Sequence, residues 1–166
     1  MSALRLLAMP SKQAESYRQG TPDAYGLTPE RRISPGGYPC RHCLGNIAEG
    51  ETYLTLAYRP FVTLQPYAEK GPIFLHADAC PRYEARDVLP PMLSSPDYIL
   101  RGYGTDDRIV YGSGGVVPTS SIMVRAEELL ASPGIAYLHV RSARNNCYQC
   151  RIERTETAAT DSRRQA

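Results

Sequence analysis

The sequence contains no run of apolar residues that approaches the roughly twenty needed for a transmembrane helix. Residues 1–10 include an apolar patch, but they lack the longer hydrophobic core and the small-residue cleavage site of a signal peptide. Lysine is also scarce: two lysines accompany seventeen arginines, and the net charge is only +2. A dedicated nucleic-acid-binding protein carries a much more basic surface. We therefore expect a cytoplasmic protein that does not bind membranes and whose partner is a protein or a small molecule, with nucleic-acid binding as a lesser alternative.

Tryptophan is absent, and two phenylalanines stand against twelve tyrosines. This balance predicts many half-buried rings whose hydroxyl groups reach water or a partner. The catalytic signatures are missing too: there is no Ser-His-Asp order, phosphate-binding loop, dinucleotide fingerprint or HExxH motif. The glycine run at residues 112–115 stands alone and indicates a loop. The sequence therefore specifies no reaction.

The length of 166 residues fits one domain, and fourteen prolines and thirteen glycines predict many turns and long connections. Alternating apolar residues predict strands at 3–8, 51–58 and 72–75, and hairpins that pair 98–103 with 108–112 and 135–141 with 147–154. Helical turns are expected at 12–20, at 78–87, and at 122–130 after an N-cap at Ser121, with loops at 21–37 and 59–71. We predict an α+β fold with a mainly antiparallel sheet, a few short helices and long loops. Residues 1–154 would form a single domain and residues 155–166 a disordered tail.

The five cysteines are the most informative residues, because cytoplasmic thiols stay reduced and an odd number cannot form a closed disulfide set. Zinc is held by four nitrogen or sulfur ligands in a tetrahedron, and two cysteines separated by two residues can reach one ion from a single turn. Cys40 and Cys43 have this spacing, and His76 and Cys80 would share one face of a helical turn. These four residues predict a structural zinc site that resembles a zinc-knuckle or treble-clef element.

Two other interpretations of the cysteines stay open. In the first, Cys40 and Cys43 are reduced thiols in a turn, and His76 and Cys80 are unrelated core or surface residues. In the other, Cys147 and Cys150 complete a four-cysteine zinc ribbon with the first pair. Strand alternation favours Cys150 as a core residue that faces the same way as Tyr148 and Ile152, with Cys147 on the opposite face. His42 could replace Cys43 as a ligand, although a histidine between two ligands more often points outward.

A catalytic site is the alternative to a metal-stabilised binding or accessory domain. His139 and Arg141 share one strand face, and Cys147 could lie opposite Arg141, where a neighbouring histidine and arginine would favour a reactive thiolate. The simpler interpretation is a polar strand face exposed to solvent. The enzyme hypothesis requires a pocket that gathers several of six candidates: Cys40, Tyr67, Arg101, His139, Arg141 and Cys147.

A set of short motifs between residues 30 and 154 resembles, in order, the bacterial domain-of-unknown-function family 1203. The motifs are Tyr38-Pro39-Cys40-Arg41, Gly50-Glu51, Pro66-Tyr67, Gly71-Pro72-Ile73-Phe74, Leu100-Arg101, Ala136-Tyr137-Leu138-His139 and Cys147-Tyr148 through Arg154. The resemblance implies a fold but no activity. Many members resemble this chain at Cys40, His139 and Cys147 and carry other residues at positions 43, 76 and 80. The resemblance therefore implies that the fold forms without a metal, that the site belongs to one branch, and that position 150 is small and apolar.

Overall fold

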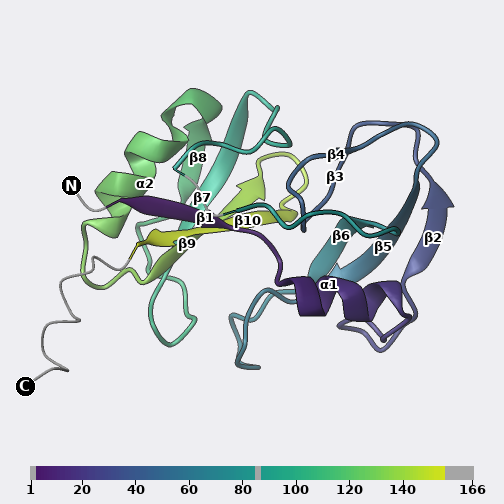
Figure 1. Ribbon diagram of the computed structural model, residues 1–166. Helices are drawn as coiled ribbons and strands as arrows, with labels where there is room; N and C mark the ends of the chain where they lie inside the picture. The colour runs from purple at the N-terminus through teal and green to yellow at the C-terminus, as the bar shows by residue number, and fades with distance from the viewer. Residues whose placement is uncertain (1–2, 85–86, 156–166) are drawn as a thin grey trace, which may run out of the picture.

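The computed structural model describes residues 3–84 and 87–155 (Figure 1). One part is a five-stranded sheet in the order β1-β10-β9-β7-β8, in which every pairing is antiparallel. Its strands are β1 (Leu4–Leu7), β7 (Asp97–Tyr103), β8 (Gly115–Pro118), β9 (Tyr137–Ser142) and β10 (Tyr148–Arg154). Helix α2 (Ile122–Leu130) follows the 3-10 turn Thr119–Ser121 and lies against this sheet. Its apolar face packs with the strands in one cluster that contains Ile122, Ala126, Leu100, Leu138 and Ile152.

The other part is a three-stranded antiparallel sheet in the order β2-β5-β6. It consists of β2 (Glu30–Ile33), β5 (Thr52–Tyr58) and β6 (Gly71–His76), beside a small hairpin of β3 (Tyr38–Pro39) and β4 (Asn46–Ile47). Helix α1 (Ser11–Arg18) lies next to this sheet (Figure 1). Buried residues of α1, the hairpin and the sheet form a second cluster, which includes Ala14, Cys40, Ile47, Leu54 and Ile73.

A β-bulge in β10 determines which side chains face each cluster. Tyr148 pairs with Arg141 and Cys150 with Val140, so Gln149 is an extra residue in this strand. The bulge turns Tyr148 into the second cluster, whereas Cys150 belongs to the first and is fully buried. The prediction that Cys150 is a core residue is confirmed. The prediction that Tyr148 faces the same way is wrong, because simple alternation does not allow for the inserted residue.

The antiparallel α+β character and helix 122–130 are confirmed, although the Ser121 side chain makes no capping hydrogen bond. Three local predictions are wrong. Residues 21–37 contain the edge strand β2, whose residues are all exposed and therefore show no alternation. Strand β7 pairs with β8, and the predicted partner segment 108–112 contributes only the bridge between Tyr103 and Ile109. The described residues of 78–87 form no helix, since Pro81 disfavours a helical backbone at Cys80, the residue before it.

The predicted C-terminal tail lies almost entirely outside the described residues. Of the predicted tail, residues 156–166 lie outside the described residues, and Thr155 donates a backbone hydrogen bond to the carbonyl oxygen of Ala3. Among the described residues, no helix has both the length and the apolar character required to cross a membrane.

Candidate metal centre

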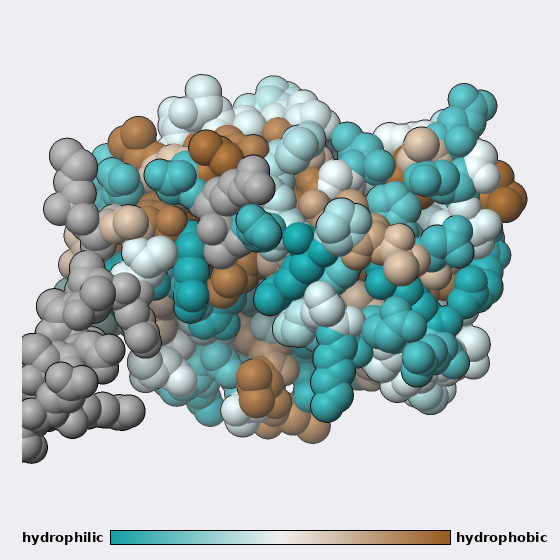
Figure 2. All heavy atoms as spheres, viewed as in Figure 1, coloured by the Kyte–Doolittle hydropathy of each residue, from teal (hydrophilic) through white to brown (hydrophobic). Residues whose placement is uncertain are grey.

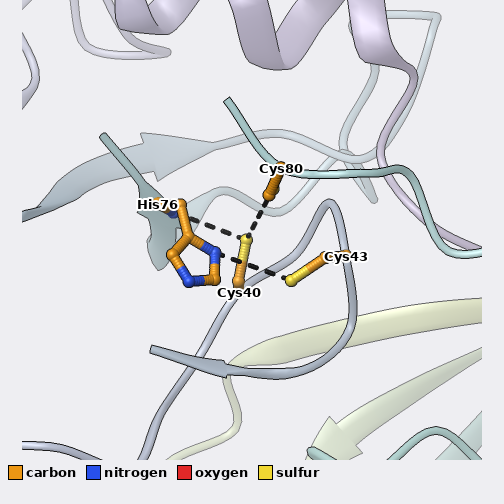
Figure 3. A group of neighbouring side chains, drawn as sticks. All are labelled: Cys40, Cys43, His76 and Cys80. Carbon is orange, nitrogen blue, oxygen red and sulfur yellow. Dashed lines mark hydrogen bonds between the residues drawn. The ribbon is translucent and has the colours of Figure 1, made fainter. Parts of the chain in front are cut away.

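The four ligand atoms predicted from the sequence lie together. One atom each from Cys40, Cys43, His76 and Cys80 falls within 4.8 Å of all the others, and Figure 3 shows these side chains turned toward one another. The Sγ atoms of Cys40 and Cys80 are 3.9 Å apart, and Cys43 Sγ lies 3.5 Å from His76 Nδ1. Tetrahedral bonds of about 2.3 Å to sulfur and 2.0–2.1 Å to nitrogen give separations of about 3.8 Å and 3.6 Å. Both pairs already have the spacing of ligands that share one tetrahedral ion.

The first pair lies in the tight turn between β3 and β4. The Leu44 N–H donates to the Cys40 carbonyl oxygen at 2.9 Å, and the Cys40 N–H donates to that of Gly45 at 2.9 Å. Leu44 has a left-handed backbone with φ of 54°, which folds the chain back. The Gly45 N–H then donates to the Cys43 sulfur. This turn presents both thiols on one side, as the two-residue spacing predicted.

The second pair arrives differently from the prediction. His76 is the last residue of β6, where its backbone N–H lies 3.4 Å from Cys40 Sγ, and Cys80 lies in an irregular segment after that strand. A treble clef would place this pair on a helix, and the described residues 77–84 contain none. Cys80 is held instead by Arg18 of α1, whose Nη2 donates to Sγ at 3.1 Å. The spacing identified these residues although its structural rationale was wrong.

His42 also contacts the group and does not point outward. It is 3% exposed, its Nδ1 lies 3.2 Å from Cys80 Sγ, and its Nε2 lies 2.9 Å from Ser11 Oγ. Burial, followed by the charge of Arg18, lowers the pKa of this imidazole, which favours the neutral ring. With Ser11 donating to Nε2, the N–H on Nδ1 donates to the sulfur. His42 is therefore positioned to hydrogen-bond the Cys80 sulfur rather than to replace Cys43 as a ligand.

Thiols this close together cannot all ionise unless a cation neutralises them. Hydrogen bonds from Cys43 and Cys80 lower the pKa of Cys40, and the same bonds raise the pKa values of Cys43 and Cys80. These pKa shifts describe a thiolate at Cys40 that accepts hydrogen bonds from the thiols of Cys43 and Cys80. A divalent cation can displace both protons and bind three thiolates, because it supplies the charge that the protons carried.

Glu51 orients the only imidazole among the four candidate ligands. Its Oε2 lies 3.2 Å from His76 Nε2 and also accepts the backbone N–H of Ala48 at 2.9 Å. A carboxylate on one ring nitrogen fixes the tautomer that leaves the other nitrogen free to bind a metal. His76 Nδ1, the nitrogen that faces Cys43, is therefore the atom that would bind an ion. Sequence reasoning missed Glu51 and Arg18, because only the fold brings them to the group, and it favoured an outward direction for His42 that the structure does not show.

The four-cysteine alternative is wrong. Cys150 is buried in the first core cluster, and Cys147 lines a hollow of about 320 Å³ together with Arg141. Neither belongs to the ligand group, and the described residues contain no other group of this kind.

The six candidates of the enzyme hypothesis do not gather in one pocket. Cys40 belongs to the metal group, and the Tyr67 hydroxyl lies 2.8 Å from the exposed Tyr111 hydroxyl. Arg101 and Arg141 both pair with Glu69, at 3.1 and 2.8 Å, a partner that the sequence did not suggest.

His139 lines a different cavity from the hollow that holds Cys147. Tyr148, and not Cys147, pairs with Arg141 across the strands, so the predicted position of Cys147 opposite Arg141 is wrong. Both His139 and Arg141 are buried. The prediction of a solvent-exposed strand face is therefore wrong, because the loop and sheet that carry Phe61 and Tyr58 cover it.

The comparisons with known proteins agree with the motifs. Residues 37–154 match the model of a family described as "Protein of unknown function (DUF1203)", and this span contains all four candidate ligands. A search of curated proteins gives no match, and neither does a search of solved structures. The chain therefore belongs to the DUF1203 family.

Proposed function

We propose that Cys40, Cys43, His76 and Cys80 hold one structural zinc ion, and that the chain is a zinc-stabilised binding or accessory domain. The observation that carries this proposal is the mutual spacing of the four ligand atoms, all within 4.8 Å of one another. Three thiolates and one imidazole are a donor set that zinc prefers, whereas magnesium and calcium prefer oxygen ligands. Four protein ligands close the tetrahedral shell and leave no position for a reactive water.

The ion would act as a crosslink between segments that lie far apart in the sequence. It would tie the β3–β4 turn to the end of β6 and to the irregular segment at Cys80. Arg18 and His42 extend the link to α1, since Arg18 belongs to this helix and His42 contacts Ser11 at its start. Free thiols in such a set persist in a reducing compartment, which supports a cytoplasmic location.

The test is metal analysis of the purified chain under reducing conditions, by native mass spectrometry together with elemental analysis. We expect one zinc per chain in the wild type, loss of this zinc in Cys43→Ser, and full zinc in Cys147→Ser. The last variant is the matched control, because Cys147 is a partly exposed thiol outside the group. Wild-type protein that stays metal-free after incubation with zinc would contradict the proposal, as would full zinc in Cys43→Ser.

The Glu51→Gln variant is expected to bind zinc about 10–100-fold more weakly, a range typical for the loss of a carboxylate that orients a histidine ligand. Competition with a chromophoric chelator measures the affinity. Glu49→Gln removes the same charge from an exposed residue two positions away and should leave the affinity unchanged. Equal affinities of the two variants would mean that Glu51 does not orient His76.

A further inference from the structure

A cavity of about 390 Å³ lies away from the metal group, between the second sheet and β9–β10. Tyr58, Phe61, Tyr148 and His139 line it with rings, and three arginines reach it: Arg59, Arg82 and Arg151. The volume lies in the range of small-molecule sites, and the wall combines apolar and aromatic residues with charged ones. The face shown in Figure 2 has its hydrophobic residues in separate groups among hydrophilic ones, so a broad apolar docking surface does not compete for this role on that face.

His139 is the residue that indicates a ligand. Its side chain is fully buried, and neither ring nitrogen has a hydrogen-bond partner among the described residues. Four aromatic rings surround it, with centroids between 4.8 and 5.2 Å away: Phe61, Tyr103, Tyr137 and Tyr148. Burial, followed by the charge of Arg141, lowers the pKa of this imidazole well below its usual value, so the ring offers one donor and one acceptor. An apolar ring would fill the same space without the cost of unpaired polar atoms.

The charges at the cavity leave a positive excess. Arg151 pairs with Glu153 and lies over the Tyr137 ring, and the Tyr137 hydroxyl donates to Asp107 at 2.8 Å. Arg82 donates to the carbonyl oxygens of Ala8 and Met9, which fix its position without neutralising its charge. No carboxylate pairs with Arg59 or Arg82 in the described ranges 3–84 and 87–155. Arg59 and Arg82 are therefore the two arginines at the cavity without a carboxylate partner, against the single negative charge of Asp107.

We propose that this cavity binds a small aromatic carboxylate. The carboxylate would meet Arg59 and Arg82, since guanidinium groups bind carboxylates with paired N–H donors. The aromatic body would lie against Phe61 and Tyr148, and a polar substituent would satisfy His139. This inference goes beyond the zinc proposal by naming a second site and the class of its ligand, and it rests on the binding-domain part of that proposal.

The test uses holoprotein with ¹⁵N-labelled histidine, in which the chain offers only three imidazoles to follow by NMR. Titration with 4-hydroxybenzoate should shift the His139 ring signals in a saturable way, and His139→Phe identifies those signals by their loss. The neutral isostere 4-hydroxybenzamide should bind at least about tenfold more weakly, because it forfeits hydrogen bonds between charged groups. Arg59→Gln should weaken 4-hydroxybenzoate binding by a similar factor, whereas Arg32→Gln, an exposed residue on β2, should not.

The titrations would overturn the inference in any of three ways: no saturable His139 shift at millimolar 4-hydroxybenzoate, equal affinities for the acid and the amide, or an unchanged affinity in Arg59→Gln. Zinc content is measured on every sample, because Arg82 lies two residues after Cys80. A zinc-loaded protein that fails to bind the probe overturns the cavity alone. A metal-free protein that binds the probe overturns the zinc site alone.

Thermal unfolding gives an independent check on His139. Because its nitrogens are unpaired, His139→Phe should raise the unfolding midpoint by about 2–4 °C while it abolishes the response to 4-hydroxybenzoate. His139→Leu, which adds no ring volume, controls for overpacking by phenylalanine. A fall of the midpoint in both variants would show that the imidazole makes structural hydrogen bonds, and it would contradict a role in binding.

Discussion

The double variant Cys40→Ser/Cys43→Ser is expected to lose its zinc and most of the stability of the segments around it. Structural zinc in small sites contributes apparent free energies of about 10–16 kcal/mol, against net stabilities of about 5–15 kcal/mol for whole domains. Strands β3 and β4 are two residues each and have little pairing of their own. Guanidinium chloride unfolding, followed by circular dichroism, measures the loss. The Cys147→Ser variant should unfold at the wild-type midpoint.

The loss of stability in the double variant should be larger in the second sheet and its hairpin than in the five-stranded sheet. The five-stranded sheet has its own core of Leu100, Leu138, Val140 and Ile152, whereas Cys40 belongs to the second cluster. We expect hydrogen exchange to accelerate in the β3–β4 hairpin and near Ala77, while amides of β9 stay protected. This pattern agrees with the implication of the family resemblance that the fold can form without a metal. An unfolding midpoint equal to that of the wild type in the double variant would rule out a structural ion.

The candidate ligands could be predicted from the sequence because part of the signal is local. A Cys-x-x-Cys turn presents two thiols whatever surrounds it, and this narrows the search for a second pair. The groups that support the ligands come from elsewhere: Arg18 lies on α1, and Glu51 stands just before β5. No spacing in the sequence relates either residue to Cys80 or His76. Their contacts arise only when α1, β5 and β6 meet in the folded chain.

The same limit explains what the sequence could not indicate about His139. Alternation correctly assigns Leu138 and Val140 to a core, and it places His139 and Arg141 on the opposite face. Whether that face meets water depends on what covers it, and the cover is the distant segment around Tyr58 and Phe61. Edge strand β2 escaped prediction for a related reason. All its residues are exposed, so its existence depends on the open edge of β5 and not on a pattern of its own.

The Arg41→Ala variant is expected to lose about 3–5 kcal/mol of unfolding free energy, because it removes two buried hydrogen bonds from a charged group, each of which contributes about 1.5–3 kcal/mol. Arg41 is 2% exposed, and its guanidinium donates to the carbonyl oxygens of Tyr148 and Pro39, each at 2.7 Å. These bonds join the metal-binding turn to the bulged end of β10. Burial lowers the pKa of Arg41 to about 10, so the group keeps its charge at neutral pH.

Alanine would remove the guanidinium donor from both carbonyl oxygens and would open a cavity beside Cys40. Arg41→Lys keeps the charge, but a single ammonium cannot reproduce the planar set of donors, so an intermediate loss is expected. Urea unfolding measures both variants, with Arg125→Ala as the control because that side chain is 42% exposed on α2. A loss in Arg41→Ala no larger than in Arg125→Ala would mean that the turn and β10 are not joined through this residue. The zinc site would then stabilise only the segments that its own ligands connect.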